Sequence, residues 1–300
     1  MTAARCSAVV LSPHFDDAVL SCPGWILERS RAGEGPVVAV PFSSPGEAAD
    51  EATLGGYERV KRGADLAVTS LGATLRTGGI VDAPLRGRSF RTLAGQLCRE
   101  AEREVVDQVR RWLAALLDEL QAREVMAPLG AGHHVDHRIT HQVALDLVAE
   151  RPGLQLTLFE ERPAAFVEEA VWLRLTQVGR VAFSGDVGVR PPAVRSQRFF
   201  QSFFGASATR QQIRPGDHAP IVVHLLEAFA RGLQEPAAAA RSSCASWSLD
   251  ILTEWLPALD ALAAESRGFV GSPLHIQWAT LEYARRLGFP GHYVERSWHL

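Results

Sequence analysis

Two short segments of the sequence gather histidine and aspartate side chains. The first is Ser12-Pro13-His14-Phe15-Asp16-Asp17, and the second is Gly132-His133-His134-Val135-Asp136-His137. Imidazole and carboxylate groups are common zinc ligands, and a catalytic zinc site uses three of them together with a water molecule. A water held in this way becomes acidic enough to act as a nucleophile near neutral pH. The residue types therefore predict a hydrolytic zinc site.

Each segment directly follows a short apolar run that is typical of a buried strand. Residues 7–12 (SAVVLS) precede the first segment, and residues 124–129 (EVMAPL) precede the second. Two further strands are predicted at 37–41 and 154–159, and helices are predicted at 17–31, 57–71, 102–120 and 137–150. This alternation is typical of an α/β fold with a Rossmann-like, mostly parallel sheet flanked by helices. Because parallel strands end at one edge of the sheet, the two segments are expected to converge there.

Three of these side chains form a plausible ligand set. His14, Asp17 and His137 supply two imidazoles and a carboxylate, the number of protein ligands that a catalytic zinc requires. Asp16 and Asp17 are adjacent, so one can bind the metal while the other takes a proton from the water as general base. An aspartate at this position can also cap the following helix, which is the alternative interpretation of Asp16.

The second segment offers groups for the remaining steps. His134 is the candidate that stabilises the oxyanion of a tetrahedral intermediate, and Asp136 can hold a histidine in the required tautomer. His137 and His141 are four residues apart and share a helical face, so they form an alternative metal-binding pair. The alternative leaves the first segment without a role, and we therefore prefer His14, Asp17 and His137.

The two motifs resemble those of a known family of enzymes. The segment PHFDD resembles the PHPDD-type motif of PIG-L/LmbE-like zinc-dependent N-deacetylases, and HVDH resembles their HxDH motif. The resemblance implies that His14, Asp17 and His137 bind zinc. It also implies that Asp16 is the general base and that His134 contributes to oxyanion stabilisation and proton transfer. The resemblance covers residues 7–163 strongly and is thin beyond them.

Several positions outside the ligands are similar to the family or depart from it. Residues 158–163 (LFEERP) resemble a YEDxP-type segment, and residues 295–298 (ERSW), which include Glu295 and Trp298, resemble a C-terminal ErxW ending of one branch. Phe15 stands where proline is usual, and Ala18 stands where glutamate is common. These two departures alter the predicted wall of the pocket, so they leave the substrate and acyl group open.

The rhythm of strands and helices changes after residue 163. We therefore predict a Rossmann-like hydrolase core at 1–163 and a C-terminal cap or substrate-specificity region at 164–300. Within the second part the patterns suggest antiparallel strands in 165–189 and helices at 221–233, 247–264 and 273–287.

The composition narrows the class of protein. With 31 basic and 34 acidic side chains, the net charge is −3, which argues against a nucleic-acid partner. No apolar run reaches the ~18 residues of a membrane span, and residues 1–12 resemble a first strand more than a signal peptide, so a cytoplasmic location is predicted. The four cysteines are widely spaced and form no CxxC pair. No GxGxxG follows the first strand, which disfavours a dinucleotide cofactor.

Together these observations predict an enzyme that uses Zn²⁺ to hydrolyse an N-acyl amide. An N-acetyl group is the acyl group that we favour. The expected substrate is a small molecule such as an amino sugar or an intermediate of secondary-metabolite biosynthesis, and a homo-oligomer is possible. Two alternatives remain open at this point. One is another zinc-dependent C–N hydrolysis on the same scaffold, and the other is a non-catalytic relative that binds small molecules.

Overall fold

The computed structural model describes residues 8–166, 168–178, 241–265 and 272–299. In this part of the chain, seven strands form one sheet in the order β3-β2-β1-β4-β5-β7-β6. The first five along the chain are mutually parallel, and β7 runs antiparallel to both β5 and β6. The strands are β1 (Ala8–Leu11), β2 (Val37–Ser44), β3 (Thr74–Val81), β4 (Glu124–Pro128), β5 (Gln155–Phe159), β6 (Arg241–Trp247) and β7 (Tyr293–His299).

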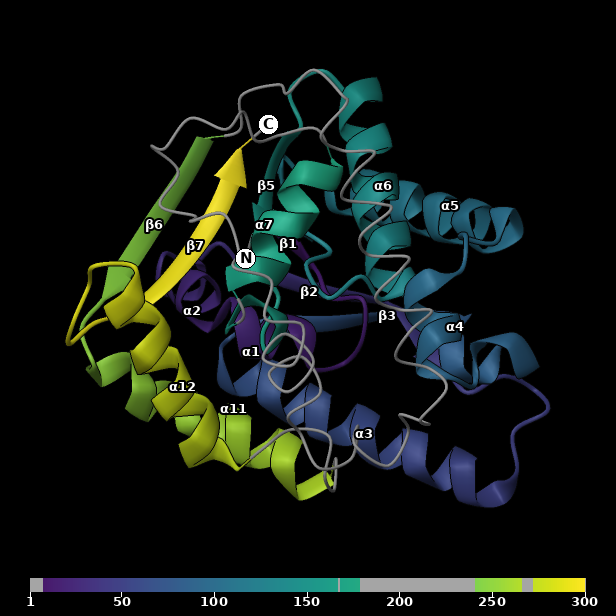
Figure 1. Cartoon of the computed structure of the whole chain (residues 1–300), viewed down its shortest axis with the longest axis horizontal. Helices are drawn as coiled ribbons and strands as arrows, with labels where there is room; N and C mark the ends of the chain where they lie inside the picture. The colour runs from purple at the N-terminus through teal and green to yellow at the C-terminus, as the bar shows by residue number, and fades with distance from the viewer. Residues whose placement is uncertain (1–7, 167, 179–240, 266–271, 300) are drawn as a thin grey trace, which may run out of the picture.

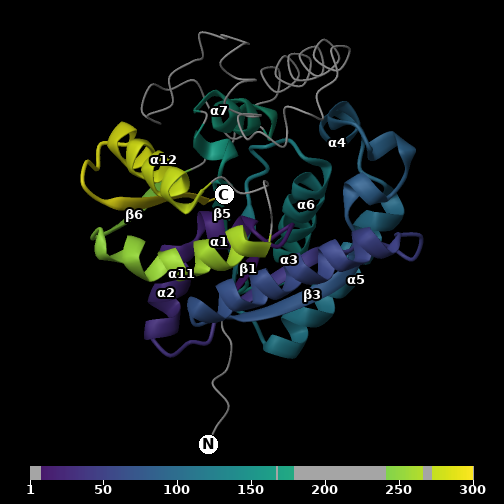
Figure 2. The ribbon, with the colours of Figure 1, turned by 90° about the horizontal axis from the view of Figure 1, so that it is seen from below.

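Helices cover both faces of this sheet, with α5 and α6 on one side and α3 and α11 on the other (Figure 1). Seen from below, α11 runs alongside α3 although the two are far apart in the sequence (Figure 2). The helices are α1 (Asp17–Ser21), α2 (Pro23–Arg31), α3 (Glu51–Ser70), α4 (Leu93–Cys98), α5 (Arg103–Leu120), α6 (Val135–Glu150), α7 (Glu168–Gln177), α11 (Asp250–Glu265) and α12 (Pro273–Arg286), with 3₁₀ turns η1 (Ala83–Leu85), η2 (Arg88–Phe90) and η3 (Ala164–Phe166). The predicted α/β fold with a mostly parallel sheet is confirmed.

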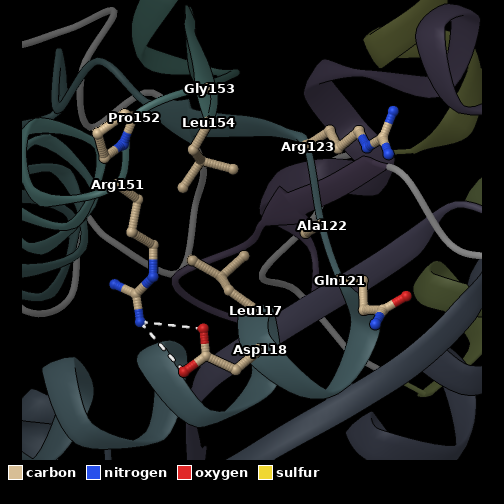
Figure 3. A pocket seen from close by; sticks show the side chains of 9 residues that line it. All are labelled: Leu117, Asp118, Gln121, Ala122, Arg123, Arg151, Pro152, Gly153 and Leu154. Carbon is tan, nitrogen blue, oxygen red and sulfur yellow. Dashed lines mark hydrogen bonds and ion pairs between the residues drawn. The ribbon is translucent and has the colours of Figure 1, made fainter.

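The two edges of the parallel strands differ in what surrounds them. At the amino ends of β4 and β5, a surface hollow lies between the end of α5 and the loop that precedes β5 (Figure 3). Arg151 and Asp118 form an ion pair beside it, with Nη2 and Oδ1 3.3 Å apart. The histidine and aspartate segments lie at the carboxyl ends of β1 and β4, so this hollow belongs to the edge away from them.

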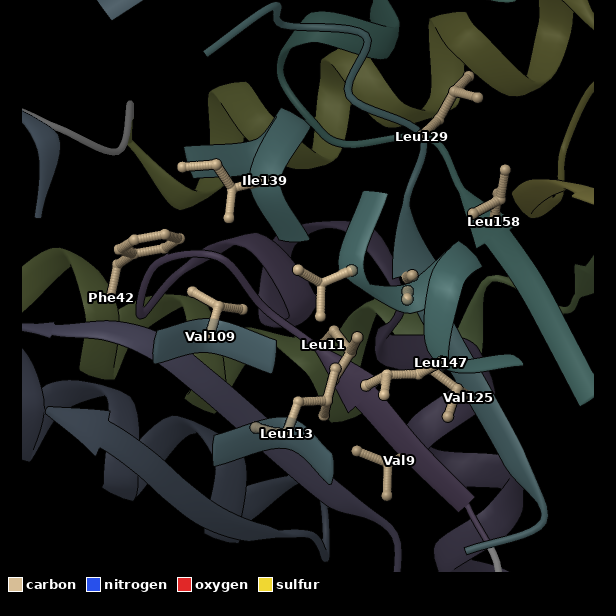
Figure 4. Packing of buried hydrophobic residues seen from close by; sticks show 14 of the residues in the cluster. Val9, Leu11, Phe42, Val109, Leu113, Val125, Leu129, Ile139, Leu147 and Leu158 are labelled. Carbon is tan, nitrogen blue, oxygen red and sulfur yellow. The ribbon is translucent and has the colours of Figure 1, made fainter. Parts of the chain in front are cut away.

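Alternating side chains of the central strands build two separate cores. Val9 and Leu11 of β1 pack with the residues under α5 and α6, whereas Val10 packs with α1, α2, α3 and α11. The first of these cores also receives Val125 from β4 (Figure 4). Because side chains on a strand point alternately to opposite faces, a strand with both faces covered is apolar throughout. This packing holds the ends of β1 and β4 rigidly in place.

The structure also departs from the predicted elements. Asp50 accepts a hydrogen bond from the backbone N–H of Thr53, so α3 begins at Glu51, before the helix predicted at 57–71. The antiparallel strands predicted in 165–189 are wrong for the part that is described, which forms α7; the rest of that range and the helix predicted at 221–233 lie outside the described residues. The helices expected at 247–264 and 273–287 are present as α11 and α12.

The sequence patterns indicated neither β3 nor the C-terminal strands β6 and β7, and the last two extend the sheet beyond β5. β7 joins the edge strand of the predicted core through Leu158 opposite Trp298 and Phe159 opposite Ser297. The described residues after 163 therefore complete the same sheet, while the division into a core at 1–163 and a cap at 164–300 stays a prediction. No helix in the described part of the chain combines the length and apolar character needed to cross a membrane.

Candidate metal centre

The two motif segments meet where the strand order reverses. The first follows β1 and the second follows β4, and these neighbouring parallel strands pair through Val10 and Met126. From this point the chain builds the sheet outward in both directions, toward β2 and β3 on one side and β5 on the other. Such a switch point leaves a crevice outside the carboxyl ends of the strands, which is where open α/β sheets bind ligands. The fold therefore brings together segments more than a hundred residues apart.

Three ligand-type atoms form a small triangle in this crevice. His14 Nδ1 lies 3.5 Å from Asp17 Oδ2. His137 Nε2 lies 3.4 Å from the same oxygen and 3.3 Å from His14 Nδ1. Tetrahedral zinc with bonds of about 2.0–2.2 Å places neighbouring ligand atoms roughly 3.3–3.6 Å apart. The donor set and its spacing thus fit a single zinc ion.

Local hydrogen bonds shape the first segment around this triangle. Asp17 Oδ2 accepts the backbone N–H of His14 at 2.8 Å. Ser12 Oγ donates to the His14 carbonyl at 2.5 Å and accepts the N–H of Ala18 at 2.9 Å. Asp16 occupies the N-cap position of α1, yet its side chain makes no capping hydrogen bond. Ser12 satisfies an amide in the first turn instead, which leaves the Asp16 carboxyl available to the crevice.

A buried carboxylate orients the imidazole of His14. Asp136 Oδ2 lies 3.2 Å from His14 Nε2 and also accepts the backbone N–H of Ala83 at 3.0 Å. Its other oxygen accepts Arg86 Nη1 at 2.6 Å. A neutral His14 with its proton on Nε2 donates to this carboxylate, which leaves the lone pair of Nδ1 facing the triangle. Asp82 Oδ1 lies 3.3 Å from the same Nε2.

His137 is oriented in the same manner by a different carboxylate. Glu161 Oε1 lies 3.1 Å from His137 Nδ1 and accepts the N–H of Gly130 at 2.6 Å, while Oε2 accepts the N–H of Ala131 at 3.2 Å. Gly130 has a φ of 82°, a conformation that suits glycine and turns the chain so that these amides face Glu161. The ring of His137 consequently presents Nε2 to the triangle.

His134 stands beside the triangle with a different electrostatic character. Its Nδ1 accepts the N–H of Asp136 at 3.3 Å and caps α6, so a neutral ring carries its proton on Nε2. Burial, together with the positive charge of His14 and His137, lowers the pKa of His134 well below its usual value. Its ring centroid lies 4.9 Å from that of His14 and 5.6 Å from that of His137. His134 is therefore a neutral hydrogen-bond donor at the crevice.

The adjacent aspartates have opposite protonation tendencies. Burial and the negative charge of Asp17 raise the pKa of Asp16 to about 7. Burial acts on Asp17 in the same direction, but the charges of His137 and His14 and a hydrogen bond outweigh it and lower the pKa of Asp17 to about 2. One carboxyl is thus firmly ionised, as a metal ligand must be, and its neighbour exchanges a proton near neutrality.

Two other sets of side chains near the site could also be considered as metal ligands. Two sets of three described side chains bring ligand atoms within 4.8 Å of one another, one joining His134 to His14 and His137, the other joining His14 to Asp82 and Asp136. In the first set, His134 Nδ1 is engaged by the backbone of α6; in the second, both oxygens of Asp136 already accept hydrogen bonds.

The alternative metal pair of His137 and His141 finds no support in this geometry. His141 Nδ1 lies 2.9 Å from the carbonyl oxygen of Pro128 at the end of β4, and the ring is 1% exposed. A hydrogen bond of this kind fixes the ring against the strand. His141 therefore acts in packing beneath the site, whereas His137, one turn earlier, belongs to the triangle.

Sequence reasoning missed Glu161, Asp82 and Tyr57 as members of the site. Tyr57 of α3 donates to Asp82 Oδ2 at 2.6 Å and packs edge-on against Phe15, with ring centroids 6.3 Å apart. Asp82 directly follows β3, and Glu161 follows β5 by two residues. The rule that parallel strands end at one edge places Glu161 at this edge because β5 was predicted, but it could not have indicated Asp82, because the largely exposed strand β3 was not predicted.

The residues that depart from the family motif are buried beside the site. Phe15 is 5% exposed, and Ala18 is fully covered by the core beneath α1. At the other end of the chain, Glu295 accepts the N–H groups of Gly24 and Trp25 at 2.6 and 3.1 Å and so caps α2. The C-terminal strand is thereby fastened to the helix that follows α1.

Known proteins share both the sequence and the fold. The chain is 30% identical over 222 residues to 2'-N-acetylparomamine deacetylase of Streptomyces fradiae, covering 70% of this chain and 78% of that protein. Its fold is similar to that of teicoplanin deacetylase in a zinc-inhibited form, with a TM-score of 0.59 at 17% identity over 97% and 96% of the two chains. It is also similar to A40926 pseudoaglycone deacetylase, with a TM-score of 0.58 at 19% identity over 98% and 97%.

The family described as PIG-L, GlcNAc-PI de-N-acetylase, matches residues 9–148. This range begins in β1 and ends in α6, so it contains both segments of the candidate metal centre. Together with the relative from Streptomyces fradiae, the match shows that the chain belongs to the PIG-L family of de-N-acetylases, which are amide hydrolases.

Proposed function

We propose that the protein hydrolyses an N-acetyl amide of a small molecule with a zinc ion held by His14, Asp17 and His137. The observation that carries this proposal is the triangle of His14 Nδ1, Asp17 Oδ2 and His137 Nε2, whose sides measure 3.3–3.5 Å. Zinc bound there would polarise the amide carbonyl and acidify a water molecule. Two imidazoles and one carboxylate leave room for that water, as in other catalytic zinc sites.

The residues around the triangle supply the proton transfers. Asp16, whose pKa lies at about 7 without metal, acts as general base and accepts the proton of the attacking water; the positive charge of a bound zinc ion would lower this pKa and keep Asp16 ionised. His134 faces the reacting carbonyl with Nε2–H and donates a hydrogen bond to the oxygen as it becomes negative. The newly protonated Asp16 then delivers its proton to the departing amine, because a neutral His134 has no acidic proton to give. Asp136 holds His14 in the tautomer that this arrangement needs.

The substrate class that we favour is an N-acetylated amino sugar within a larger biosynthetic intermediate. The relative from Streptomyces fradiae, which is named for a substrate of this kind, supports this class. The changes at Phe15 and Ala18 lie beside the catalytic aspartates, so the pocket wall differs from that of better-known sugar deacetylases. A different acyl group or another C–N bond therefore remains an outcome to be tested rather than a separate proposal.

The test begins with metal-free protein that is then supplied with zinc. We expect about one zinc per chain in the wild type and its loss in Asp17→Ala and His137→Ala, because a three-ligand site that loses a ligand binds far more weakly. Elemental analysis gives the zinc content. Acetate release from N-acetylparomamine and a panel of other amides, including amides of longer acyl groups, gives the activity.

His141→Ala is the matched control, since His141 lies one turn after His137 on the same helix but contacts Pro128. It should keep its zinc. A wild type that takes up no zinc would overturn the proposal and favour a non-catalytic binding protein. Zinc uptake with cleavage only of other C–N bonds would keep the metal centre and correct the substrate.

A further inference from the structure

We infer that Glu161 is a positioning residue that fixes the ring of His137 for metal binding. The inference rests on the proposed function, because it concerns how the zinc ligand is held. Glu161 itself is 1% exposed and lies behind His137, away from the triangle, so it acts through the histidine. Its contacts, its anchoring and the segment around it each support this role.

The contacts of Glu161 determine which nitrogen of His137 carries a proton. Backbone amides only donate hydrogen bonds, and Glu161 accepts from two of them, Gly130 N–H on Oε1 and Ala131 N–H on Oε2. The carboxylate is therefore an acceptor on both oxygens. His137 Nδ1, 3.1 Å from Oε1, must donate, and Nε2 is left with its lone pair. The two amides also come from the turn after β4, so one side chain holds that turn and the ligand together.

The residue before Glu161 anchors the segment to the C-terminal part of the chain. Glu160 Oε1 accepts Arg296 Nε at 2.6 Å and Trp298 Nε1 at 2.8 Å, and Oε2 accepts the hydroxyl of Tyr283 at 2.7 Å. Glu160 is 4% exposed, so these bonds form in the interior. Glu160 therefore bonds to strand β7 and helix α12, whereas Glu161 has its own separate contacts with His137 and the turn after β4.

The residue after Glu161 connects the same segment to the other side of the metal centre. Arg162 donates from Nη1 to the carbonyl of Leu20 at 3.3 Å and from Nη2 to the carbonyl of Val294 at 2.6 Å. Its backbone N–H donates to Ser21 Oγ at 3.0 Å. Leu20 and Ser21 form the end of α1, the helix that begins with Asp17. Three consecutive buried residues thus connect β7, the His137 ligand and the helix of the Asp17 ligand.

The carboxylate behind the other histidine is held differently. Asp136, which orients His14, is neutralised by the guanidinium of Arg86 at 2.6 Å. The hydrogen bonds that anchor Glu161 come from neutral amides and His137, and the buried guanidinium of Arg174 acts on its charge through space. We therefore expect metal affinity to depend on the charge of Glu161 and not only on its shape.

The experiment compares two neighbouring, equally buried carboxylates in the full chain. Glu161→Gln keeps the shape of the side chain but removes its charge. The new side-chain NH₂ group would also face a backbone N–H of Gly130 or Ala131, so two hydrogen-bond donors would meet. Glu160→Gln removes a charge that contacts Arg296 and Trp298 instead of the ligand. Zinc affinity is measured by competition with a chromophoric chelator, and cobalt is substituted to record the visible absorption spectrum of the site.

We expect zinc affinity to fall about tenfold or more in Glu161→Gln, with an altered cobalt spectrum, because second-shell partners of metal ligands have effects of this size. Glu160→Gln should lose stability yet stay within about twofold of the wild-type affinity, well below the second-shell effect. If Glu161→Gln does not fold, Glu161→Asp keeps the charge but shortens its reach, so it tests the contact with His137 Nδ1 against the same Glu160→Gln control.

Unchanged zinc affinity and cobalt spectrum in folded Glu161→Gln would overturn the inference while leaving the proposed function intact. Equal losses in Glu161→Gln and Glu160→Gln would also overturn it, since they would show a general structural effect. A wild-type protein that binds no zinc would overturn the proposed function itself. This outcome can be distinguished from the two above, in which the wild type binds zinc and only the variants decide.

Discussion

The two edges of the parallel sheet each carry an arginine–aspartate pair, and the pairs differ in their surroundings. At the carboxyl edge, Arg86 and Asp136 lie 2.6 Å apart with side chains 5% and 0% exposed. At the amino edge, Arg151 and Asp118 lie 3.3 Å apart with side chains 27% and 69% exposed (Figure 3). Water screens the second pair, so its two charges can separate at little cost. The first pair has no such freedom, because a buried charge without its partner is strongly unfavourable.

The polarity of the fold explains why buried charge collects at only one edge. Loops that follow parallel strands lead into helix N-termini, whose free amides and dipoles stabilise negative charge. Asp136 lies in the first turn of α6, and the amides of Ala83, Gly130 and Ala131 point at buried carboxylates. These donors supply hydrogen bonds to the buried carboxylates beside the metal triangle. At the amino edge, charged side chains rely on water instead.

The largest effect is expected from breaking the buried pair. Arg86→Ala leaves Asp136 ionised in the interior with only His14 and Ala83 as partners. We expect a loss of about 3–5 kcal/mol in the free energy of unfolding, the range measured when one partner of a buried ion pair is removed. Zinc affinity should fall as well, since Asp136 orients His14. Chemical denaturation of the metal-free protein gives the first quantity, and chelator competition gives the second.

Arg86→Lys is the matched control for this variant. Lysine keeps the positive charge but cannot reproduce the guanidinium contacts with Asp136, Glu102 and the carbonyl of Val81. An intermediate loss of stability is therefore expected. If Arg86→Ala were as stable as the wild type, the contrast between the two edges would not hold.

A smaller effect concerns pH, which should act on the carboxyl edge alone. Burial lowers the pKa of His14 and His137, but nearby carboxylates outweigh it: chiefly Asp82, Asp136 and Asp17 for His14, and Asp17 and Glu161 for His137. Both pKa values are thus raised in the metal-free protein. Zinc binds neutral imidazole, so protons compete with the metal below these pKa values. Affinity should rise with pH, by about tenfold per unit for each proton released.

Chelator competition at pH 6, 7 and 8 measures this dependence. Asp118→Ala, altered only at the amino edge, should follow the wild-type profile, because its side chain is 69% exposed and lies away from the histidines. A zinc affinity that stays constant over this range would contradict the raised pKa values of His14 and His137.

The convergence of His14, Asp17 and His137 could be predicted because all three follow short apolar strands, whereas metal binding by them stays a proposal. Residues 7–12 and 124–129 are recognisable without any tertiary information, and the position of a side chain after such a strand determines the edge at which it lies. Glu161 follows a strand too, but no periodicity shows that its carboxylate reaches His137 across the turn after β4. Such partners depend on tertiary packing, and they become visible only when β4 and β5 are paired.

The C-terminal strands show the same limit for the fold. β6 reads RSSCASW and is exposed along most of its length, so it lacks the apolar alternation of a half-buried strand. β7 contains Glu295 and Arg296, charges that are unusual in a buried strand and are stabilised there by partners from distant elements. Local sequence favours neither strand. Their pairing with each other and with β5 determines their structure.

The smallest effect on stability is expected for the exposed ion pair of Arg151 and Asp118. Measuring it gives a number against which the buried pair can be compared. A double-mutant cycle of Arg151→Ala and Asp118→Ala should give a coupling energy of about 0–1 kcal/mol, the usual range for exposed ion pairs, decreasing further in high salt. The same cycle on Arg86 and Asp136 should give a coupling energy several times larger. Removing a single partner of a buried ion pair already costs about 3–5 kcal/mol. Equal coupling at both edges would mean that burial does not distinguish them. A larger coupling for Arg151 and Asp118 would show that the hollow at the amino edge excludes water, and the role of that hollow would then have to be reconsidered.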